Sequence, residues 1–326
     1  MFWRRKKAPA LPPQIGCFGK LPATGDFIRM NAGSDELAAF DGWLGPAIDY
    51  ARRDMGHAFE PAYQSSVGMF IFHGDGKGDD LPARGLVGAW AASGDNAGRM
   101  YPMVVFGSYD YNHLVSAGAA LPISLWPLLS AAYECVTGGR NLPVAAFLDR
   151  VARIAPPSLE SPQQSAVGYR EWLAGHPIKA FWDTGFASDA NRYWVIQNIA
   201  ASVEPFLGQE HPKTHLGIRL PLGSADAYAA AIWMDMTLRL AKWSRTLLNA
   251  FWVPRQSMLL HLGPPHIASF REIIAPTGDA DHVADLCGMP TVDEQTSRRL
   301  LGAKLDALVA KTDQSLAEFL DGLSAS

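Results

Sequence analysis

The chain has 326 residues, of which 48% are hydrophobic and 18% are charged, and its formal net charge is −4. This composition is typical of a globular protein that buries a sizeable core, in one large domain or two modest ones. A net negative charge excludes the overall positive field that would attract nucleic acid, so we expect no nucleic acid partner.

The N-terminal segment, residues 1–13, is predicted to be a disordered, basic and proline-rich tail. Its four cations at residues 4–7 are followed by prolines and not by the apolar run of a signal peptide. Four charges give only weak contact with anionic lipid, and no stretch is long and apolar enough to span a bilayer. Three distant cysteines, Cys17, Cys135 and Cys287, indicate a reducing compartment. We therefore expect a cytoplasmic protein without stable membrane insertion.

The region after the tail is predicted to contain a helix and then three strands. Apolar residues recur at helical spacing over residues 34–53, where Ser34 is a good N-cap residue. Strand-like patterns follow over residues 67–72, 86–91 and 101–108, separated by turns rich in glycine. This arrangement predicts neighbouring antiparallel strands.

The middle of the chain is predicted to be helical. One apolar stripe over residues 125–139 ends at two glycines, and a second helix starts behind Pro143. Residues 155–165 are rich in proline and serine and form the best candidate for a long loop or subdomain boundary. A further helix is expected over residues 191–207.

The remaining pattern alternates between strand and helix. Strands are predicted over residues 216–222 and 258–262, and helices over residues 226–248 and 265–274. This order favours two parallel strands joined by a right-handed crossover. The last segment, residues 276–326, is predicted to be a helical extension.

Together these elements predict an α/β protein in which one mixed sheet is covered by helices on both faces, with its main domain over residues 14–275. Residues 155–165 are a possible internal boundary of this domain. Most of the ten tryptophans are expected in the core, with Trp252 as a candidate exposed anchor.

A glycine-rich loop near the start, "GKLPATGDF", has the composition of a phosphate-binding loop. A Walker A loop, however, requires a hydroxyl residue after its Gly-Lys pair, and here Leu21 and Pro22 follow Lys20. Pro22 also has no backbone N–H to donate to a phosphate. A dinucleotide fingerprint is missing as well. We therefore expect no nucleotide cofactor.

Metal and nucleophile motifs are weak throughout the sequence. Residues 73–82 lack the ligand order of a calcium loop. The histidine pairs His211/His215 and His261/His266 have no cysteine or HExxH context, so we expect surface or packed histidines and no metal. Ser93 and Cys17 are the candidate nucleophiles of a competing hydrolase hypothesis, although no G-x-S-x-G elbow is present and a buried thiol is the more frequent role. No catalytic residue is assigned.

Two sequence blocks resemble the signature of TagF proteins, accessory regulators of the bacterial type VI secretion system. That family opens with G-[WFY]-[FY]-G-K-L-P-x-x-G-D-F and a D-x-W-L helix. The matching residues here are Gly16, Phe18, Gly19, Lys20, Leu21, Pro22, Gly25, Asp26, Phe27, Asp41, Trp43 and Leu44. The second block is G-x-x-x-x-S-x-D-x-x-G-R-x-[YF]-P, matched by Gly88, Ser93, Asp95, Gly98, Arg99, Tyr101 and Pro102.

The resemblance is strong over residues 14–108, and the chain departs from the pattern at Cys17, where the family has an aromatic residue, and in its last fifty residues. It implies a cytoplasmic three-layer αβα domain without catalysis or cofactor. It also implies a post-translational repressor that engages the forkhead-associated (FHA) scaffold protein of the secretion apparatus. A small hydrolase and a structural component of the apparatus remain as alternatives.

Five charged residues in the two blocks are the candidate partner-binding residues. They are Lys20, Asp26, Arg29, Asp95 and Arg99. We expect the two loops to lie together and form one patch, in which the aspartates accept hydrogen bonds from the arginines. The alternative is that Asp26 caps a helix beginning near Phe27 or pairs with Arg99. If the charge pairs are buried, removing one partner is expected to unfold the protein instead of weakening a contact.

Overall fold

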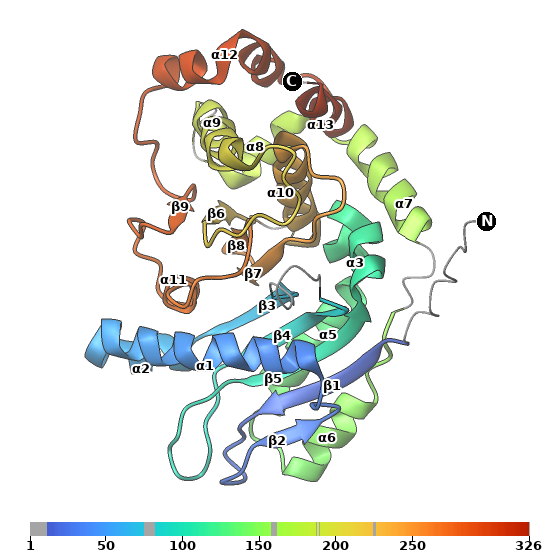
Figure 1. Cartoon of the computed structure of the whole chain (residues 1–326), viewed down its shortest axis with the longest axis vertical. Helices are drawn as coiled ribbons and strands as arrows, with labels where there is room; N and C mark the ends of the chain where they lie inside the picture. Colours follow the sequence, from blue (N-terminus) through green and yellow to red (C-terminus); the bar gives the residue numbers. More distant parts are fainter. Residues whose placement is uncertain are drawn as a thin grey trace, which may run out of the picture.

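The structure is a computed structural model that describes residues 12–74, 82–157, 162–186, 188, 190–223 and 226–325. These described residues form one nine-stranded mixed sheet in the order β2-β1-β5-β4-β3-β7-β8-β6-β9. Helices cover both faces of the sheet, which confirms the predicted α/β class (Figure 1). The predicted N-terminal tail and the predicted loop at 73–82 fall mostly outside the described residues.

The N-terminal half of the sheet is antiparallel throughout. It consists of β1 (Gln14–Gly19), β2 (Ile28–Met30), β3 (Val67–Phe72), β4 (Arg84–Ala91) and β5 (Met103–Asp110). The three strands predicted in this region correspond to β3, β4 and β5. Neither β1 nor β2 is predicted from the sequence, because β1 contains two glycines and β2 has three residues, too few to show an alternating pattern.

The C-terminal half of the sheet differs from the prediction in the direction of its strands. It consists of β6 (Gly217–Pro221), β7 (Asn249–Val253), β8 (Ser257–His261) and β9 (Val283–Asp285). The unpredicted strand β7 forms a hairpin with β8, so β6 and β8 are antiparallel and the expected crossover between them is wrong. Within the described residues, β6 and β9 form the one parallel pair.

One face of the sheet is covered by helices from both ends of the sequence. They are α1 (Asp35–Met55), α2 (Phe59–Gln64) and α11 (Ser269–Ile274), with the short 3-10 turn η1 (Gly56–Ala58) between the first two. An aromatic core lies beneath α1, in which the Phe40 ring stacks on Phe70 at 4.8 Å. In Figure 1, α1 runs across the strands of the N-terminal half.

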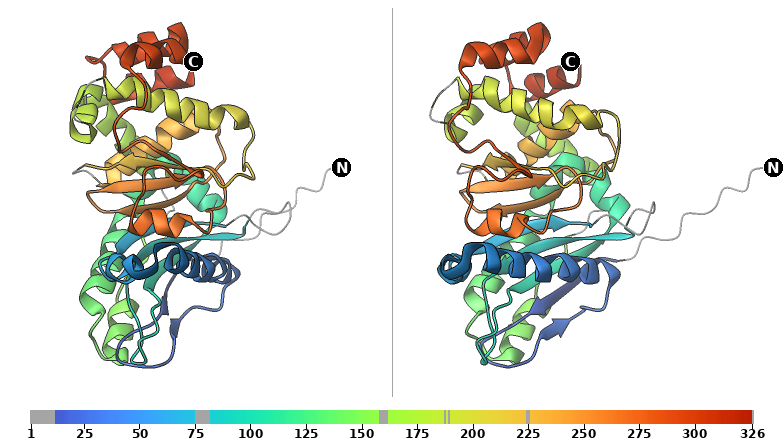
Figure 2. Two further views of the ribbon diagram at one scale, coloured as in Figure 1. Left: turned by 90° about the vertical axis from the view of Figure 1, so that its left-hand side faces the viewer. Right: turned by 60° about the vertical axis from the view of Figure 1, so that its left-hand side comes forward.

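The opposite face is covered by a larger group of helices, which the views of Figure 2 show from the sides. This group is α3 (Tyr111–Ala117), α4 (Leu121–Ser124), α5 (Trp126–Gly139), α6 (Val144–Ala152), α7 (Pro162–Gly175), α8 (Ile178–Gly185), α9 (Asn191–Val203) and α10 (Asp226–Ala241), with 3-10 turns η2 (Gly118–Ala120) and η3 (Glu204–Phe206). The predicted helices over residues 125–139, 143–154 and 191–207 are confirmed. By contrast, α7 begins inside the segment predicted as a loop, residues 155–165, whose middle lies outside the described residues.

The last helices are α12 (Glu294–Ala310) and α13 (Leu316–Ser324), as predicted for this end of the chain. A capping box starts α13, in which Ser315 and Glu318 exchange hydrogen bonds with each other's backbone N–H. The side chains of Leu316, Phe319 and Leu320 are buried in the same core as the helices around α10. The division at residue 275 stays a prediction. Strand β9 lies beyond this residue and pairs with β6 within the sheet.

Two further expectations concern tryptophan and the membrane. Trp252 lies on β7 and is 1% exposed, so its interpretation as an exposed anchor is wrong. Among the described residues, no single helix combines the length and apolar character needed to cross a bilayer. One pair of helices bent by 60°, Tyr111–Ser124 and Trp126–Gly139, meets both criteria when taken together.

Candidate functional site: the junction of the two signature loops

Two loops that carry the signature residues lie side by side at one end of the molecule. The first signature loop, residues 20–27, joins β1 to β2, and the second, residues 92–102, joins β4 to β5. Figures 1 and 2 show both at the lower end. The amide of Asn96 donates to the carbonyl oxygen of Thr24 at 3.2 Å, and Arg99 Nη2 donates to that of Gly25 at 2.6 Å. The prediction that the loops meet is therefore correct.

A buried ion pair joins the two loops. Lys20 Nζ donates to Asp95 Oδ2 at 2.5 Å, and the two side chains are 6% and 0% exposed. Asp95 also accepts from Arg99 Nε at 2.7 Å and from the backbone amides of Arg99 and Ala97 at 2.9 and 3.0 Å. The Lys20 ammonium, followed by the donors of Arg99 and Ala97, holds the pKa of Asp95 well below its usual range. Asp95 therefore stays ionised and keeps its loop closed.

Gly19 explains how the lysine reaches this position. Its φ is +143°, and a Cβ atom there would lie 2.1 Å from the carbonyl oxygen of Pro102 and 2.7 Å from the Cα of Met103. A side chain would therefore clash with rigid backbone in a conformation that L-residues rarely adopt. Only glycine lets β1 end against the start of β5 and direct Lys20 into the second loop.

Ser93 is part of the same junction and is not available as a nucleophile. Its side chain is buried, and its Oγ donates to the carbonyl oxygen of Lys20 at 2.7 Å. Tyr63 Oη donates to the carbonyl oxygen of Ser93 at 2.9 Å and so fixes the strand end from the other side. Ser93 thus has a structural role in the junction.

Cys17, the other candidate nucleophile, is fully buried on β1. Burial raises the pKa of its thiol to about 12, so the thiolate required for nucleophilic attack is not formed near neutral pH. Both reactive side chains of the hydrolase hypothesis are therefore inaccessible.

An aromatic cluster packs against the end of the first signature loop. The Phe27 ring stacks on Phe18 with centroids 5.1 Å apart and contacts the ring of Tyr101 edge-on, also at 5.1 Å. Tyr101 Oη donates to Asp41 Oδ1 of α1 at 2.5 Å, which connects the cluster to the helix of the first sequence block. Lys20 Nζ lies 4.5 Å from the centre of the Phe27 ring, a cation–π distance.

The five predicted site residues fall into two groups. Lys20, Asp95 and Arg99 form the ion-pair cluster, although Lys20 and Asp95 are buried. Arg29 is exposed and lies 5.3 Å from the centre of the Phe18 ring, while Asp26 is exposed on the first loop. Asp26 precedes strand β2 and not a helix, so the capping interpretation is wrong, and Arg99 pairs with Asp95 and not with Asp26.

Three contributors to the junction were not identified from the sequence. Phe27 enters the sequence analysis only as a residue that matches the family pattern. An aromatic residue directly after a Gly-Asp turn is a sequence signal that could have indicated its place in the junction. The hydrogen bond between Asp41 and Tyr101 also links the two blocks, and neither residue is among the predicted contact residues. Nothing in the local sequence of Tyr63 indicates its contact with Ser93, because 30 residues separate them.

Metal ligation has no support in the part of the chain that the structure describes, where no group of three or more His, Cys, Asp or Glu side chains is arranged to hold an ion. His261 is fully buried on β8, and burial lowers the pKa of its imidazole to about 3. His215 is exposed, and its ring lies 5.6 Å from that of His266.

The fold and the junction define an α/β protein with a rigid, charged loop surface at one end of its sheet. Residues 16–154 match the family model described as the TagF N-terminal domain, type VI secretion system-associated. The matched part of the chain includes both signature loops, most of β1 and all of β2 to β5.

A crystal structure of PA0076 from Pseudomonas aeruginosa PAO1 is also similar. The two chains are 16% identical, the match covers 82% of this chain and 96% of the other, and the TM-score is 0.46. No curated protein matches the chain.

Proposed function

We propose that this protein is an accessory regulator of the bacterial type VI secretion system, which acts in the cytoplasm as a post-translational repressor by binding the FHA-domain scaffold protein. The observation that carries the proposal is the match of residues 16–154 to a domain associated with that secretion system. The resemblance of both sequence blocks to TagF proteins supplies the repressor role and the scaffold partner.

The geometry of the junction favours recognition over chemistry. Lys20 and Asp95 lock the two loops together, so that exposed side chains such as Arg29 and Arg99 are presented on a fixed backbone. A surface that is ordered before binding loses less conformational entropy when a partner docks. The hydrolase alternative requires Ser93 or Cys17 to be accessible, and both are buried.

A deletion and overexpression experiment tests the proposed function. A repressor predicts that deletion raises the amount of a secreted type VI substrate in the medium and that overexpression lowers it, with unchanged levels of the scaffold transcript and protein. A structural component predicts the reverse for deletion, which would abolish secretion.

A direct binding measurement completes the test. The purified full chain is expected to retain the purified FHA scaffold protein in a pull-down. Turnover of an ester or phosphate substrate that is lost in the variant Ser93→Ala or Cys17→Ala would contradict the proposal and support the hydrolase. Loss of secretion on deletion would support the structural role.

A further inference from the structure

Phe27 is an aromatic side chain that is both exposed and held in place. It is 37% exposed, and among the exposed large hydrophobic side chains of the described residues it is the aromatic one. Its ring nevertheless contacts Phe18 and Tyr101, each at 5.1 Å, and lies beneath the ammonium of Lys20. Exposure of a large apolar ring to water is unfavourable. Because its neighbours hold the Phe27 ring, no side-chain conformational entropy offsets this cost.

Such a ring has the properties of an interface anchor. Residues that dominate binding energy are frequently aromatic or arginine side chains, and they bind best where little flexibility is lost. Phe27 meets both conditions because its neighbours fix the ring before any partner arrives.

Two arginines stand beside this ring. Arg29 is exposed, its guanidinium lies 5.3 Å from the Phe18 ring and 6.0 Å from the Phe27 ring, and it forms no ion pair with any described carboxylate. Arg99 has a side chain that is 65% exposed although its Nε bonds Asp95. Since Lys20 neutralises Asp95, the exposed charges are two guanidinium groups and the single carboxylate of Asp26. The surface therefore has an excess of positive charge beside an apolar ring.

We propose that this surface, formed by Asp26, Phe27, Arg29, Asn96 and Arg99 and called here the Phe27 surface, is where the scaffold protein docks. The matching partner segment presents an apolar side chain to the exposed part of the Phe27 ring and an aspartate or glutamate to the guanidinium of Arg29. A guanidinium without a carboxylate partner is suited to such a contact. This inference rests on the proposed function and adds the contact residues and the chemistry of the partner.

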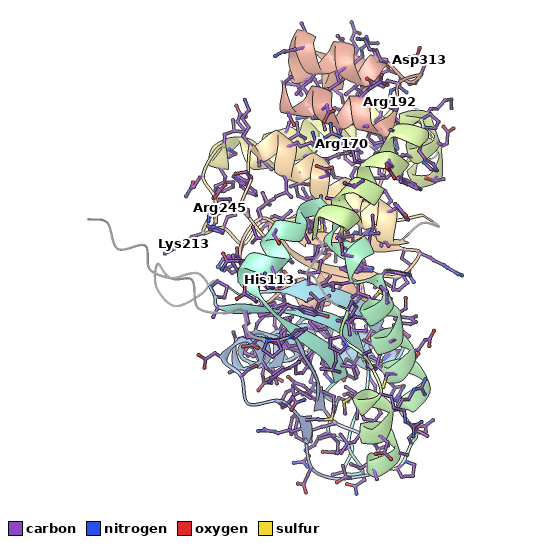
Figure 3. The ribbon with its side chains drawn as sticks, turned by 90° about the vertical axis from the view of Figure 1, so that its right-hand side faces the viewer. His113, Arg170, Arg192, Lys213, Arg245 and Asp313 are labelled. Atoms are coloured by element: carbon purple, nitrogen blue, oxygen red, sulfur yellow. The ribbon has the colours of Figure 1, made fainter. Side chains whose placement is uncertain are left out.

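The test measures the affinity of purified full-length variants for the purified FHA scaffold protein by calorimetry. Phe27→Ala and Arg29→Glu are each expected to raise Kd at least tenfold. The matched controls are Leu300→Ala, an exposed apolar residue of α12, and Arg245→Glu, whose side chain lies in the upper half of Figure 3, away from the signature loops. Both controls are expected to change Kd less than twofold.

Thermal melts of the same variants separate binding from folding. Phe27→Ala removes ring contacts and is expected to lower the melting temperature, whereas Arg29→Glu changes an exposed charge and is expected to leave it nearly unchanged. Raising the salt concentration is expected to weaken scaffold binding by the native protein more than binding by Arg29→Glu, because salt screens the ion pair that Arg29 forms with the partner.

Two results would overturn the inference, and they differ in what they say about the proposed function. If the native protein binds the scaffold and Arg29→Glu binds equally well with normal stability, the Phe27 surface is wrong while the repressor role stands. If the native protein does not bind the scaffold at all, both proposals fail.

Discussion

The two halves of the sheet are stabilised in different ways. In the N-terminal half, side chains far apart in sequence form buried polar contacts, such as Lys20 with Asp95 and Arg84 with Glu36. In the C-terminal half, the long-range ion pair of Arg219 with Asp285 joins residues that already face each other on the paired strands β6 and β9 and not two loops. Other polar contacts there are local, as in the ion pair of Asp235 with Arg239, four residues apart, and the capping box of α13. A network of distant partners fixes loops in space, which apolar packing does less specifically. The docking surface is expected on the half whose loops are held this way.

The buried imidazole of His261 and the buried carboxylate of Asp95 differ in their hydrogen bonding. Both of its ring nitrogens lack a hydrogen-bond partner among the described residues, and the side chain is fully buried on β8. The buried carboxylate of Asp95, by contrast, accepts four hydrogen bonds from Lys20, Arg99 and Ala97. Acid and mutation should therefore act differently on these two buried groups.

The largest expected effect is that of Asp95→Ala, which strands the buried ammonium of Lys20. Breaking a buried, hydrogen-bonded ion pair is strongly destabilising, so the melting temperature is expected to fall by roughly 10 °C. Calorimetry on the purified chain measures the change.

The double variant Lys20→Met with Asp95→Leu is the control for this prediction. It leaves no unpaired charge, so it should lose less stability than Asp95→Ala alone. If the double variant is less stable than either single variant, the unpaired charge is not the cause.

An intermediate effect is expected from acidification. The pKa of His261 is about 3 in the folded protein, below the ordinary value of 6.5, so between these values the unfolded chain binds a proton that the native chain does not. The free energy of unfolding then falls as pH decreases, by about 1.4 kcal/mol per pH unit for this group, or roughly 2 kcal/mol by pH 5. His73 adds to the loss, because burial lowers its pKa to about 4. Asp95 adds a loss of stability only below about pH 4, because its pKa in the folded protein lies below the ordinary value of a carboxyl group.

The variant His261→Leu isolates the contribution of His261. Denaturant titrations at pH 7 and pH 5 should show a smaller loss of stability in this variant than in the native protein, by roughly 2 kcal/mol. An unchanged pH dependence would mean that folding does not lower the pKa of His261.

The smallest expected effect is that of Ser315→Ala at the start of α13. The Ser315 hydroxyl satisfies the amide of Glu318, and losing an N-cap of this type costs about 1 kcal/mol. The melting temperature should fall by only about 2–4 °C, which differential scanning calorimetry resolves. A loss as large as that of Asp95→Ala would show that the C-terminal half depends on single polar contacts as strongly as the N-terminal half.

The predictability of the fold also differs between the halves. Strands such as β3 and β5 follow alternating apolar residues, which sequence patterns report directly. In the C-terminal half, the predicted helix over 226–248 ends early at Ala241, where Lys242 has a φ of +56°. A positive φ at a residue other than glycine is uncommon and has no sequence signal. The strand β7 that follows was therefore missed, and with it the direction of β8.

The candidate site was predicted in its members but not in its burial. The two blocks predicted that Lys20 and Asp95 lie in one patch with the arginines as donors to the aspartates, and the pairing of Lys20 itself with Asp95 was not predicted. Whether a charge pair is buried depends on what packs around it. That packing comes from Tyr63 and Phe27, which reach the junction from another helix and from the loop tip. Tertiary contacts of this kind leave no local pattern in the sequence.

The pairing of β3 with β7 has a consequence for how the chain is made. The family-matched segment ends at residue 154, but β3 has its second neighbour in β7, whose first residue is Asn249. At a synthesis rate of roughly 5–20 residues per second, roughly 10–35 seconds pass between the synthesis of β3 and that of β7. Until then the backbone N–H and C=O groups by which residues 69–71 pair with β7 have no strand partner, so the growing polypeptide carries an open strand edge that a chaperone can bind or an identical nascent chain can join.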